Sequence, residues 1–249
     1  MEPIGEGVPE LAGPRPPRSA VADVERGSGR VPALRWWRGG SSVAESSSSI
    51  EASSLSCVAT PEETIGPYFV DDRLYRSDLT SRTTRHGVVD GVPFRLNLAV
   101  YEVSGGACAP LSRAPVDVWH ADALGTYSDE AAVGTRGQTY LRGYQITDDE
   151  GAVTFRTIYL GWCSGRTVHI HVLIRLFDVS GNTALQLTTQ MYFDDAITDA
   201  VLAGAPYDSR GRRDKTNSTD SLDRGSLEAA LARSGDGYDA TFRIGLETA

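Results

Sequence analysis

A strand-like run in the second half of the chain constrains the fold more than any other sequence feature. Residues 167–176 read Thr-Val-His-Ile-His-Val-Leu-Ile-Arg-Leu. Side chains alternate between the two faces of a β-strand, so residues two apart point the same way. One face of this run is wholly apolar, because it carries Val168, Ile170, Val172, Ile174 and Leu176. The pattern predicts a strand with its back buried against a core.

The other face of this predicted strand carries His169 and His171, two of the four histidines in the chain. Because the two residues are spaced two apart, both imidazoles project from the same side and can fill two cis positions on a metal. The alternative is a pair of structural or surface histidines. Their place on an otherwise apolar strand favours metal binding.

Short segments with the same alternation recur along the chain, separated by clusters of Gly, Asp and Ser. They cover residues 94–100, 116–119, 153–157, 187–193 and 238–246. Many short strands punctuated by turns are typical of an all-β sandwich or barrel. We also expect a helix from Asp195 to Ala203, which starts at a carboxylate pair and ends before Gly204, and a second short helix over 226–233.

The composition divides the 249-residue chain into a tail and a folded part. Residues 1–55 are rich in Pro, Gly, Ser, Glu and Arg. Such a segment buries too little apolar surface to offset the entropy that it loses on ordering. We therefore predict a disordered, proteolytically labile tail over 1–55 and one domain over 56–249. The hydrophobic content of 40% is sufficient for one domain of this size.

The charge and hydropathy of the chain exclude two classes of partner. The formal net charge of −9 argues against nucleic acid, because phosphate binding needs a basic surface. No apolar run approaches the roughly 18 residues of a membrane span. Met1 is followed by neither the basic start nor the apolar segment of a signal peptide, so we expect a cytoplasmic protein. Export would require a start codon set too far upstream, masking a real signal.

Three cysteines are too few for a disulfide scaffold. One bridge is compatible with the sequence, with Cys57 and Cys108 as the favoured pair, and it would leave Cys163 free beside the histidines. The alternative is three reduced thiols in a cytosolic protein. The sequence leaves both arrangements open.

A second candidate segment lies where the predicted strand over 116–119 opens into a loop that contains Tyr127. Considered alone, Tyr127 is a loop tyrosine. His120 shares a strand face with Val116 and Val118, which predicts a structural histidine whose ring is hydrogen-bonded in the core.

Several longer motifs follow one another in a fixed order. They occupy residues 60–62, 66–69, 116–120, 125–128, 141–143, 155–158, 161–162, 165–171, 190–193 and 217–220. In this order and spacing the chain resembles the intradiol ring-cleavage dioxygenases, which are non-haem iron(III) enzymes that open catechols between their two hydroxyls. The resemblance runs from about Cys57 to Leu246. It is strongest to the single-chain proteins similar to protocatechuate 3,4-dioxygenase.

The resemblance implies a prealbumin-like antiparallel β-sandwich with Fe(3+) as its cofactor. It also implies a small aromatic diol and O2 as substrates, with cleavage of a catechol-type ring to a muconate-type diacid. A homo-oligomer is compatible with the resemblance. The helical amino-terminal dimerisation domain of catechol 1,2-dioxygenases has no counterpart in residues 1–55.

By position, the resemblance assigns iron to His169, His171 and Tyr127. The second tyrosine ligand of the family follows a Gly-Trp pair, six residues before the first histidine, and here Cys163 occupies that position. A thiolate is shorter than a tyrosinate, and it is a soft, reducing donor that favours iron(II), zinc or copper(I). Three arrangements stay open: Cys163 as the fourth ligand, Tyr159 as a stand-in, or three protein ligands with water in the gap.

The resemblance also assigns residues to the substrate pocket. Arg166 matches an arginine that stabilises the developing anion of the substrate, and the alternative is a surface arginine in a turn. Gln190 matches a glutamine that lines the pocket. Its strand face is polar, so a solvated position is the alternative. Pro67 and Tyr68 are expected in the pocket wall.

Cys163 is also the residue that suggests an alternative to the enzyme function. The alternative to the enzyme is a non-catalytic or catalytically altered relative that binds a metal or a small aromatic on the same β-sandwich. The other expected site residues are all present, which favours the enzyme, since a decayed site would have lost more than one residue. A cupin-type metal site also begins with His-x-His, but residues 172–178 lack its downstream glutamate.

Overall fold

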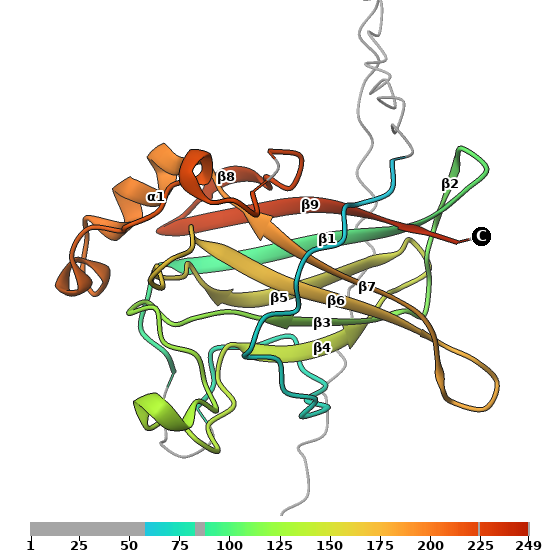
Figure 1. Cartoon of the computed structure of the whole chain (residues 1–249), viewed down its shortest axis with the longest axis horizontal. Helices are drawn as coiled ribbons and strands as arrows, with labels where there is room; N and C mark the ends of the chain where they lie inside the picture. The colour runs from blue at the N-terminus through green and yellow to red at the C-terminus, as the bar shows by residue number, and fades with distance from the viewer. Residues whose placement is uncertain (1–57, 83–87, 224, 249) are drawn as a thin grey trace, which may run out of the picture. The chain divides into compact units, whose positions relative to one another are not determined.

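The computed structural model describes residues 58–82, 88–223 and 225–248, which form a β-sandwich (Figure 1). The tail predicted over 1–55 lies outside the described residues. The strands are β1 (Pro93–Ser104), β2 (Ala107–Pro110), β3 (Pro115–Trp119), β4 (Arg142–Ile146), β5 (Ala152–Ile158), β6 (His169–Phe177), β7 (Thr183–Tyr192), β8 (Ala230–Ser234) and β9 (Gly237–Glu247). One α-helix, α1 (Asp195–Leu202), accompanies the 3-10 turns η1 (Ala131–Val133), η2 (Tyr207–Arg210) and η3 (Asn217–Thr219).

The strands make two sheets. One sheet has the order β2-β1-β9-β8, with β5 also paired to β1, and the other has the order β4-β3-β6-β7. Every pairing in the second sheet is antiparallel. In the first sheet β1 runs antiparallel to β2 and β5 but parallel to β9. The expected all-β sandwich is confirmed, and the β1–β9 pair is the departure from an antiparallel pattern among the strands named above.

The core lies between the two sheets, and β6 supplies the predicted apolar face. Ile170 and Val172 are fully buried and pack in one cluster with Leu96 of β1 and with residues of β9. Full burial of a side chain of this size stabilises the fold by about 1.5–3 kcal/mol relative to an exposed position. The opposite face of β6, which carries His169 and His171, therefore points to the outer side of the β4-β3-β6-β7 sheet.

Residues 58–79, which we call the N-terminal strap, cross the outer side of this sheet. The backbone of the strap bonds to β9 through the N–H of Thr60 and to β7 through the N–H of Glu63, each with an N···O distance of 2.8 Å. It reaches β5 through the N–H of Leu79, at 2.9 Å. Figure 1 shows the strap in blue as it crosses the strands. It is therefore tied to both sheets.

Helix α1 confirms the helix predicted from Asp195, with its end within one residue of the expected position. The side chain of Asp194 accepts a hydrogen bond from the N–H of Ile197 at 2.9 Å, which satisfies one of the free donors of the first turn. No helix in the described ranges is long and apolar enough to cross a membrane.

The second helix expected over 226–233 is wrong, because residues 230–234 form the edge strand β8. Leu231 pairs with Ala240 of β9 and packs against the main core. Helix propensity is a weak preference that tertiary packing readily overrides, and here strand pairing with β9 decides the conformation.

Cys108, on β2, is disulfide-bonded, whereas Cys163 is a free thiol. Cys57, the partner predicted for Cys108, lies outside the described residues. The pairing itself therefore stays a prediction.

Candidate metal centre

His169 and His171 lie side by side on the outer face of β6, and both are almost fully buried. Their Nε2 atoms are 3.1 Å apart. Two cis ligands of one metal, each bound at about 2.1 Å, have a similar separation. The predicted pair is therefore brought together in an arrangement that suits a metal ion.

The hydrogen bonds of the two imidazoles show that their Nε2 atoms lack a suitable partner among the described residues. Nδ1 of His169 donates to the carbonyl oxygen of Thr167 at 2.7 Å, so its Nε2 carries a lone pair. Nδ1 of His171 is buried and has no hydrogen-bond partner among the described residues. If His171 carried its proton on Nε2, that proton would lie between the two Nε2 atoms and His171 Nδ1 would be an unpaired acceptor. If His171 carried its proton on Nδ1 instead, the lone pairs of the two Nε2 atoms would face each other. A cation shared by both Nε2 atoms removes this repulsion, so the residues fit a metal.

Burial keeps both imidazoles neutral. Removal from water, with the positive charge of Arg166 as the second cause, lowers the pKa of His169 to about 4. Burial also lowers the pKa of His171 well below its usual range, helped by His169 and Arg166. The neutral imidazole is the form that binds a metal, so neither histidine has to lose a proton at neutral pH.

Trp119, at the end of β3, fixes the ring of His171. It lies opposite His171 in the β3–β6 register, and the two rings stack within 6° of parallel with their centroids 4.8 Å apart. Gly66 of the strap also approaches this ring, because a Cβ there would come within 3.1 Å of His171 Cε1. The φ of Gly66 is +68°, which favours glycine as well. The strap therefore crosses the ring at a residue without a side chain.

Tyr127 approaches the histidines from the loop after β3. Its ring centroid is 6.2 Å from that of His171, and Tyr68 of the strap stacks on it with centroids 4.3 Å apart. Burial raises the pKa of Tyr127 well above its usual value, and Cys163 adds to this rise while Arg166 opposes it. A phenolate at Tyr127 therefore needs a cation nearby.

Tight backbone contacts hold the Tyr127 loop. The carboxylate of Asp122 accepts hydrogen bonds from two backbone N–H groups of the loop, at 2.9 and 3.0 Å. Gly125, with φ +72°, lies against the backbone of Trp162, where a Cβ would be 1.9 Å from the carbonyl oxygen. The loop of Tyr127 and the segment that carries Cys163 therefore pack directly against each other.

Arg142, at the start of β4, joins the Tyr127 loop to the strap. Its buried guanidinium donates to Ser128 Oγ at 2.7 Å, to the Ser128 carbonyl at 2.6 Å and to the Tyr68 carbonyl at 3.1 Å. The planar guanidinium imposes a fixed directional fork on these bonds. Arg142 therefore fixes the backbone beside both stacked tyrosines.

Cys163 lies in the wall of the site. It packs against the small apolar cluster formed by Trp119, Ala121, Tyr127 and Leu173. Burial raises the pKa of the Cys163 thiol, although Arg166 and Arg210 oppose the rise. Across residues 58–82, 88–223 and 225–248, no three His, Cys, Asp or Glu side chains come together in a group that could hold a metal. The role of Cys163 as a ligand therefore stays a prediction.

Tyr159 does not serve as the stand-in ligand. It is fully buried in the main core, its hydroxyl is bonded to Thr198 Oγ1 at 2.7 Å, and its ring packs edge-on against Phe94. The Tyr159 arrangement is wrong, because this side chain faces the core between the sheets and not the outer face of β6.

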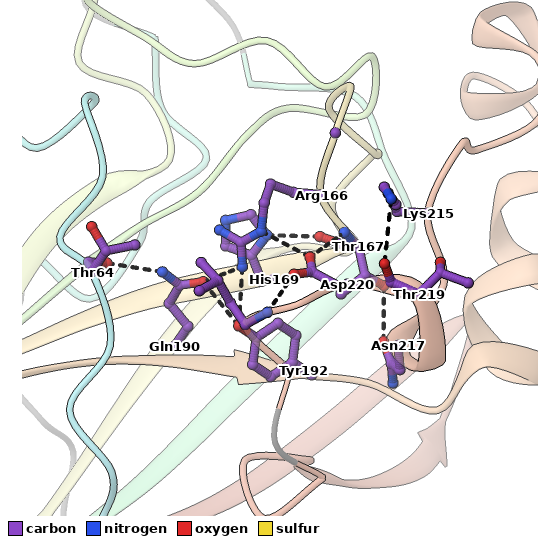
Figure 2. A network of polar contacts seen from close by, with 12 residues as sticks. Thr64, Arg166, Thr167, His169, Gln190, Tyr192, Lys215, Asn217, Thr219 and Asp220 are labelled. Atoms are coloured by element: carbon purple, nitrogen blue, oxygen red, sulfur yellow. Dashed lines mark hydrogen bonds and ion pairs between the residues drawn. The ribbon is translucent and has the colours of Figure 1, made fainter.

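Arg166 lies beside His169 and is held by three side chains (Figure 2). Its Nε donates to Asp220 Oδ2 at 2.8 Å, and its Nη2 donates to Gln190 Oε1 at 2.7 Å and to the Tyr192 hydroxyl at 3.0 Å. The side chain is 22% exposed, so Arg166 is not a free surface arginine. A positive charge fixed beside two neutral imidazoles can stabilise an anion bound there.

Gln190 lies opposite His171 in the β6–β7 register and is fully buried. Its Oε1 accepts from Arg166 and from Tyr192, and its Nε2 donates to the carbonyl oxygen of Thr64 at 2.8 Å. The solvated alternative is therefore wrong, because the strap covers this end of β7.

His120 and Pro67 complete the predicted residues. His120 is buried, with Nδ1 2.8 Å from the Ala121 carbonyl oxygen and Nε2 2.7 Å from Thr157 Oγ1, which confirms its structural role. Pro67 is exposed next to Gly66 in the strap, and its part in a pocket wall stays a prediction.

Some residues around the site were not predicted from the sequence. They are Trp119, Arg142, Tyr192 and Asp220. A signal existed for Trp119, since strand alternation puts it on the face opposite Val116 and Val118. Arg142 and Asp220 lie in the motifs over 141–143 and 217–220, but no local pattern indicates their roles, because their contacts join segments that are distant along the chain.

A protein-family model described as dioxygenase matches residues 64–208, more than half of the 249-residue chain. The matched range contains His169, His171, Tyr127 and Arg166. No curated protein matches the chain in sequence.

Solved structures of dioxygenases are similar to this chain. The dioxygenase domain of a dioxygenase carbohydrate-binding protein fusion from the cellulolytic bacterium Streptomyces sp. SirexAA-E is 32% identical with a TM-score of 0.56, over 77% of this chain and 100% of that chain. Catechol 1,2-dioxygenase from Pseudomonas arvilla C-1 is 25% identical with a TM-score of 0.52, over 76% and 62%. An intradiol ring-cleavage dioxygenase from Tetranychus urticae shares the fold, with a TM-score of 0.66 at 24% identity over 77% and 95%.

Proposed function

The chain belongs to the intradiol ring-cleavage dioxygenase family, and on that premise we propose that it is a non-haem iron(III) enzyme that cleaves a catechol-type ring between its two hydroxyls with O2. The proposed product is a muconate-type diacid. The observation that carries the proposal is the convergence of the Nε2 atoms of His169 and His171, 3.1 Å apart on a buried face.

His169, His171 and Tyr127 are the proposed ligands. Two neutral imidazoles and one phenolate match the preference of iron(III) for anionic oxygen donors with imidazole as a neutral partner. Bound there, iron(III) would supply Lewis-acid activation of a chelated diol and a template for the ring and O2. The protein contributes a dry setting for these groups, because the three side chains are almost fully buried.

Arg166 and Gln190 are the proposed groups on the substrate side. Arg166 holds a positive charge beside the histidines, where a substrate that gains negative charge would be stabilised. Gln190 accepts from Arg166 through Oε1 at 2.7 Å and is itself tied to the strap, so it sets the direction of the guanidinium. Tyr68 supplies an aromatic wall that suits a flat ring.

Cys163 is the observation that favours a second candidate function. With cysteine in place of the family's tyrosine, the chain could be a non-catalytic or catalytically altered relative that binds a metal or a small aromatic. The two functions differ in one measurable property, which is O2 consumption by the iron-loaded protein in the presence of a catechol.

The purified protein, before and after anaerobic addition of catechol, tests the proposed function. We expect about one iron per chain, a visible tyrosinate-to-iron(III) band, a shift of that band on catechol binding, and O2 uptake on re-aeration. A visible band with a catechol shift but no O2 uptake would support the second candidate. A colourless protein that holds zinc or no metal after iron reconstitution would overturn the dioxygenase proposal.

Replacing Cys163 with serine tests the ligand set. Cys163 joins no group of three His, Cys, Asp or Glu side chains that could hold a metal in the part of the chain that the structure describes, and a thiolate is a softer donor than iron(III) prefers. We therefore expect Cys163→Ser to keep its iron and its visible band and to change kcat/KM by less than about threefold. Iron content and the visible spectrum are the measurements. Loss of iron or a large shift of the band would identify Cys163 as a ligand.

A further inference from the structure

One carboxylate, that of Asp220, supports both Arg166 and the backbone that orients His169. Oδ2 of Asp220 accepts from Arg166 Nε and from the backbone N–H of Thr167, both at 2.8 Å. The carbonyl oxygen of Thr167 in turn accepts from His169 Nδ1 at 2.7 Å. Figure 2 shows these contacts as one connected network. The charged arginine and one of the two histidines therefore share a single support.

Asp220 is withdrawn from solvent, with 1% of its side chain exposed. Burial alone would raise the pKa of this carboxyl, but hydrogen bonds from the N–H groups of Leu222 and Thr167, together with Arg166, hold the pKa below its usual range. Its Oδ1 accepts from Leu222 N at 2.9 Å. Asp220 is therefore a charged carboxylate with both oxygens bonded to the protein.

Thr167 is held from a second direction by the same segment of chain. Its hydroxyl donates to Asn217 Oδ1 at 2.8 Å, and Asn217 Nδ2 donates to the carbonyl oxygen of Phe193 at 2.8 Å. Thr167, whose carbonyl oxygen orients His169, is thus held at its N–H by Asp220 and at its hydroxyl by Asn217. Residues 217–220 act on the site through Thr167 and through Arg166.

We propose that Asp220 is a positioning residue that orients both Arg166 and His169. Anion stabilisation and metal binding then depend on the same carboxylate. The part that concerns Arg166 rests on the proposed ring-cleavage function. An amide at position 220 could accept one N–H but would leave the guanidinium without its charged partner. Groups that orient the ligands of a metal contribute about 10- to 100-fold to metal affinity or activity.

The substitution Asp220→Asn tests the proposal against a matched control, Asp214→Asn. Asp214 is an exposed carboxylate that accepts from Ser164 Oγ at 2.8 Å and from Gly165 N at 3.1 Å, on the turn just before Arg166. We expect Asp220→Asn to lower kcat/KM for catechol about 10- to 100-fold and Asp214→Asn to change it by less than about threefold. Equal losses would show that both carboxylates merely hold the turn, and would overturn the proposal.

A double-mutant cycle tests whether Asp220 acts through Arg166. In an Arg166→Met background, assayed with iron in excess, Asp220→Asn is expected to cost less than about threefold in kcat/KM, because the partner that it positions is gone. The same 10- to 100-fold loss in both backgrounds would remove Arg166 from the proposal.

The part that concerns His169 is measured without catalysis, by titrating Zn²⁺ into the metal-free protein. We expect about tenfold weaker zinc binding in Asp220→Asn and unchanged binding in Asp214→Asn. Equal zinc affinity in wild type and Asp220→Asn would overturn this part. Zinc binding that depends on Asp220, in a protein that cleaves no catechol, would count against the proposed function and leave the positioning of His169 supported.

Asp220→Glu is the second variant, for use if Asp220→Asn does not fold. It keeps the charge but displaces both acceptor oxygens by one methylene. The same losses in kcat/KM and in zinc affinity are expected, and thermal unfolding of the metal-free proteins checks that the variants are folded. A folded Asp220→Glu protein with the kcat/KM and the zinc affinity of the wild type would overturn the proposal.

Discussion

Replacing His171 with leucine is expected to abolish iron binding and to lower kcat/KM for catechol by more than about 10³-fold, since groups that only orient metal ligands already cost 10- to 100-fold. The substitution removes one of the two neutral nitrogens that meet at 3.1 Å. Iron content after reconstitution and O2 uptake with catechol measure the effect. Retention of one iron per chain would contradict the proposed ligand set.

The same variant is expected to keep the stability of the metal-free protein. His171 Nδ1 is buried without a partner among the described residues. An unsatisfied buried polar atom costs about 1–3 kcal/mol, and leucine removes it while filling most of the space against Trp119. Thermal unfolding of the metal-free protein is the measurement. A midpoint several degrees below that of the wild type would contradict this account of His171.

His120→Leu is the matched control for this experiment. His120 is as buried as His171, but both of its ring nitrogens are bonded, to the Ala121 carbonyl and to Thr157 Oγ1. Its replacement is expected to destabilise the fold by about 1–3 kcal/mol, because it leaves those groups unpaired, and to leave iron binding intact. The replacement of His171 is thus expected to affect iron binding, and the replacement of His120 to affect the free energy of unfolding. Loss of iron in both variants would show a general disruption instead.

Replacing Arg166 with methionine is expected to lower kcat/KM for catechol by about 10²- to 10³-fold, the cost of removing one fixed group that stabilises a developing anion. Its guanidinium is held in place by Asp220, Gln190 and Tyr192 and therefore needs no reorganisation during the reaction. Iron content is expected to stay at the wild-type level, because Arg166 is not a proposed ligand. Steady-state kinetics and iron analysis of the same preparation separate the two effects.

Arg210→Met is the control for a nearby positive charge that lies outside the hydrogen-bond network of Arg166. Arg210 is an exposed arginine near Cys163 whose guanidinium carbon lies 4.6 Å from the centroid of the Trp162 ring. We expect this variant to keep kcat/KM within about threefold of the wild type. Equal losses in Arg166→Met and Arg210→Met would mean that the general positive field of this region matters and not the fixed place of Arg166.

Much of the fold could be predicted from the sequence, because strands with one buried face have a period of two residues. β6 is the clearest case, since its apolar face and its histidine face alternate without interruption. The strands β2, β4 and β8 were not predicted. The sequence of β8 is Ala-Leu-Ala-Arg-Ser, which has good helix formers, and it becomes a strand only by pairing with β9. β4 begins with a buried arginine, so its hydrophobic pattern is weak.

The site could be predicted only where its geometry is local. His169 and His171 are neighbours on one strand, so alternation was enough to place them together. Asp220 is 54 residues from Arg166, and Thr64 is 126 residues from Gln190, so these contacts follow from the tertiary fold. For the same reason the polar face of Gln190 could not be distinguished from a solvated face. The strap that buries it comes from the start of the domain.

The parallel pairing of β1 with β9 fixes the order in which a newly made chain can complete this centre. β1 leaves the ribosome early, but β9, its neighbour in the sheet, emerges after all the proposed iron ligands. The strap that crosses His171 also depends on β9, because Thr60 N bonds to the carbonyl oxygen of Gly245 at 2.8 Å. Contacts between such distant segments form slowly and late. The strap can therefore take its final place across His171 only after β9 has been made, so a metal held by the proposed ligands would be enclosed once the domain is complete.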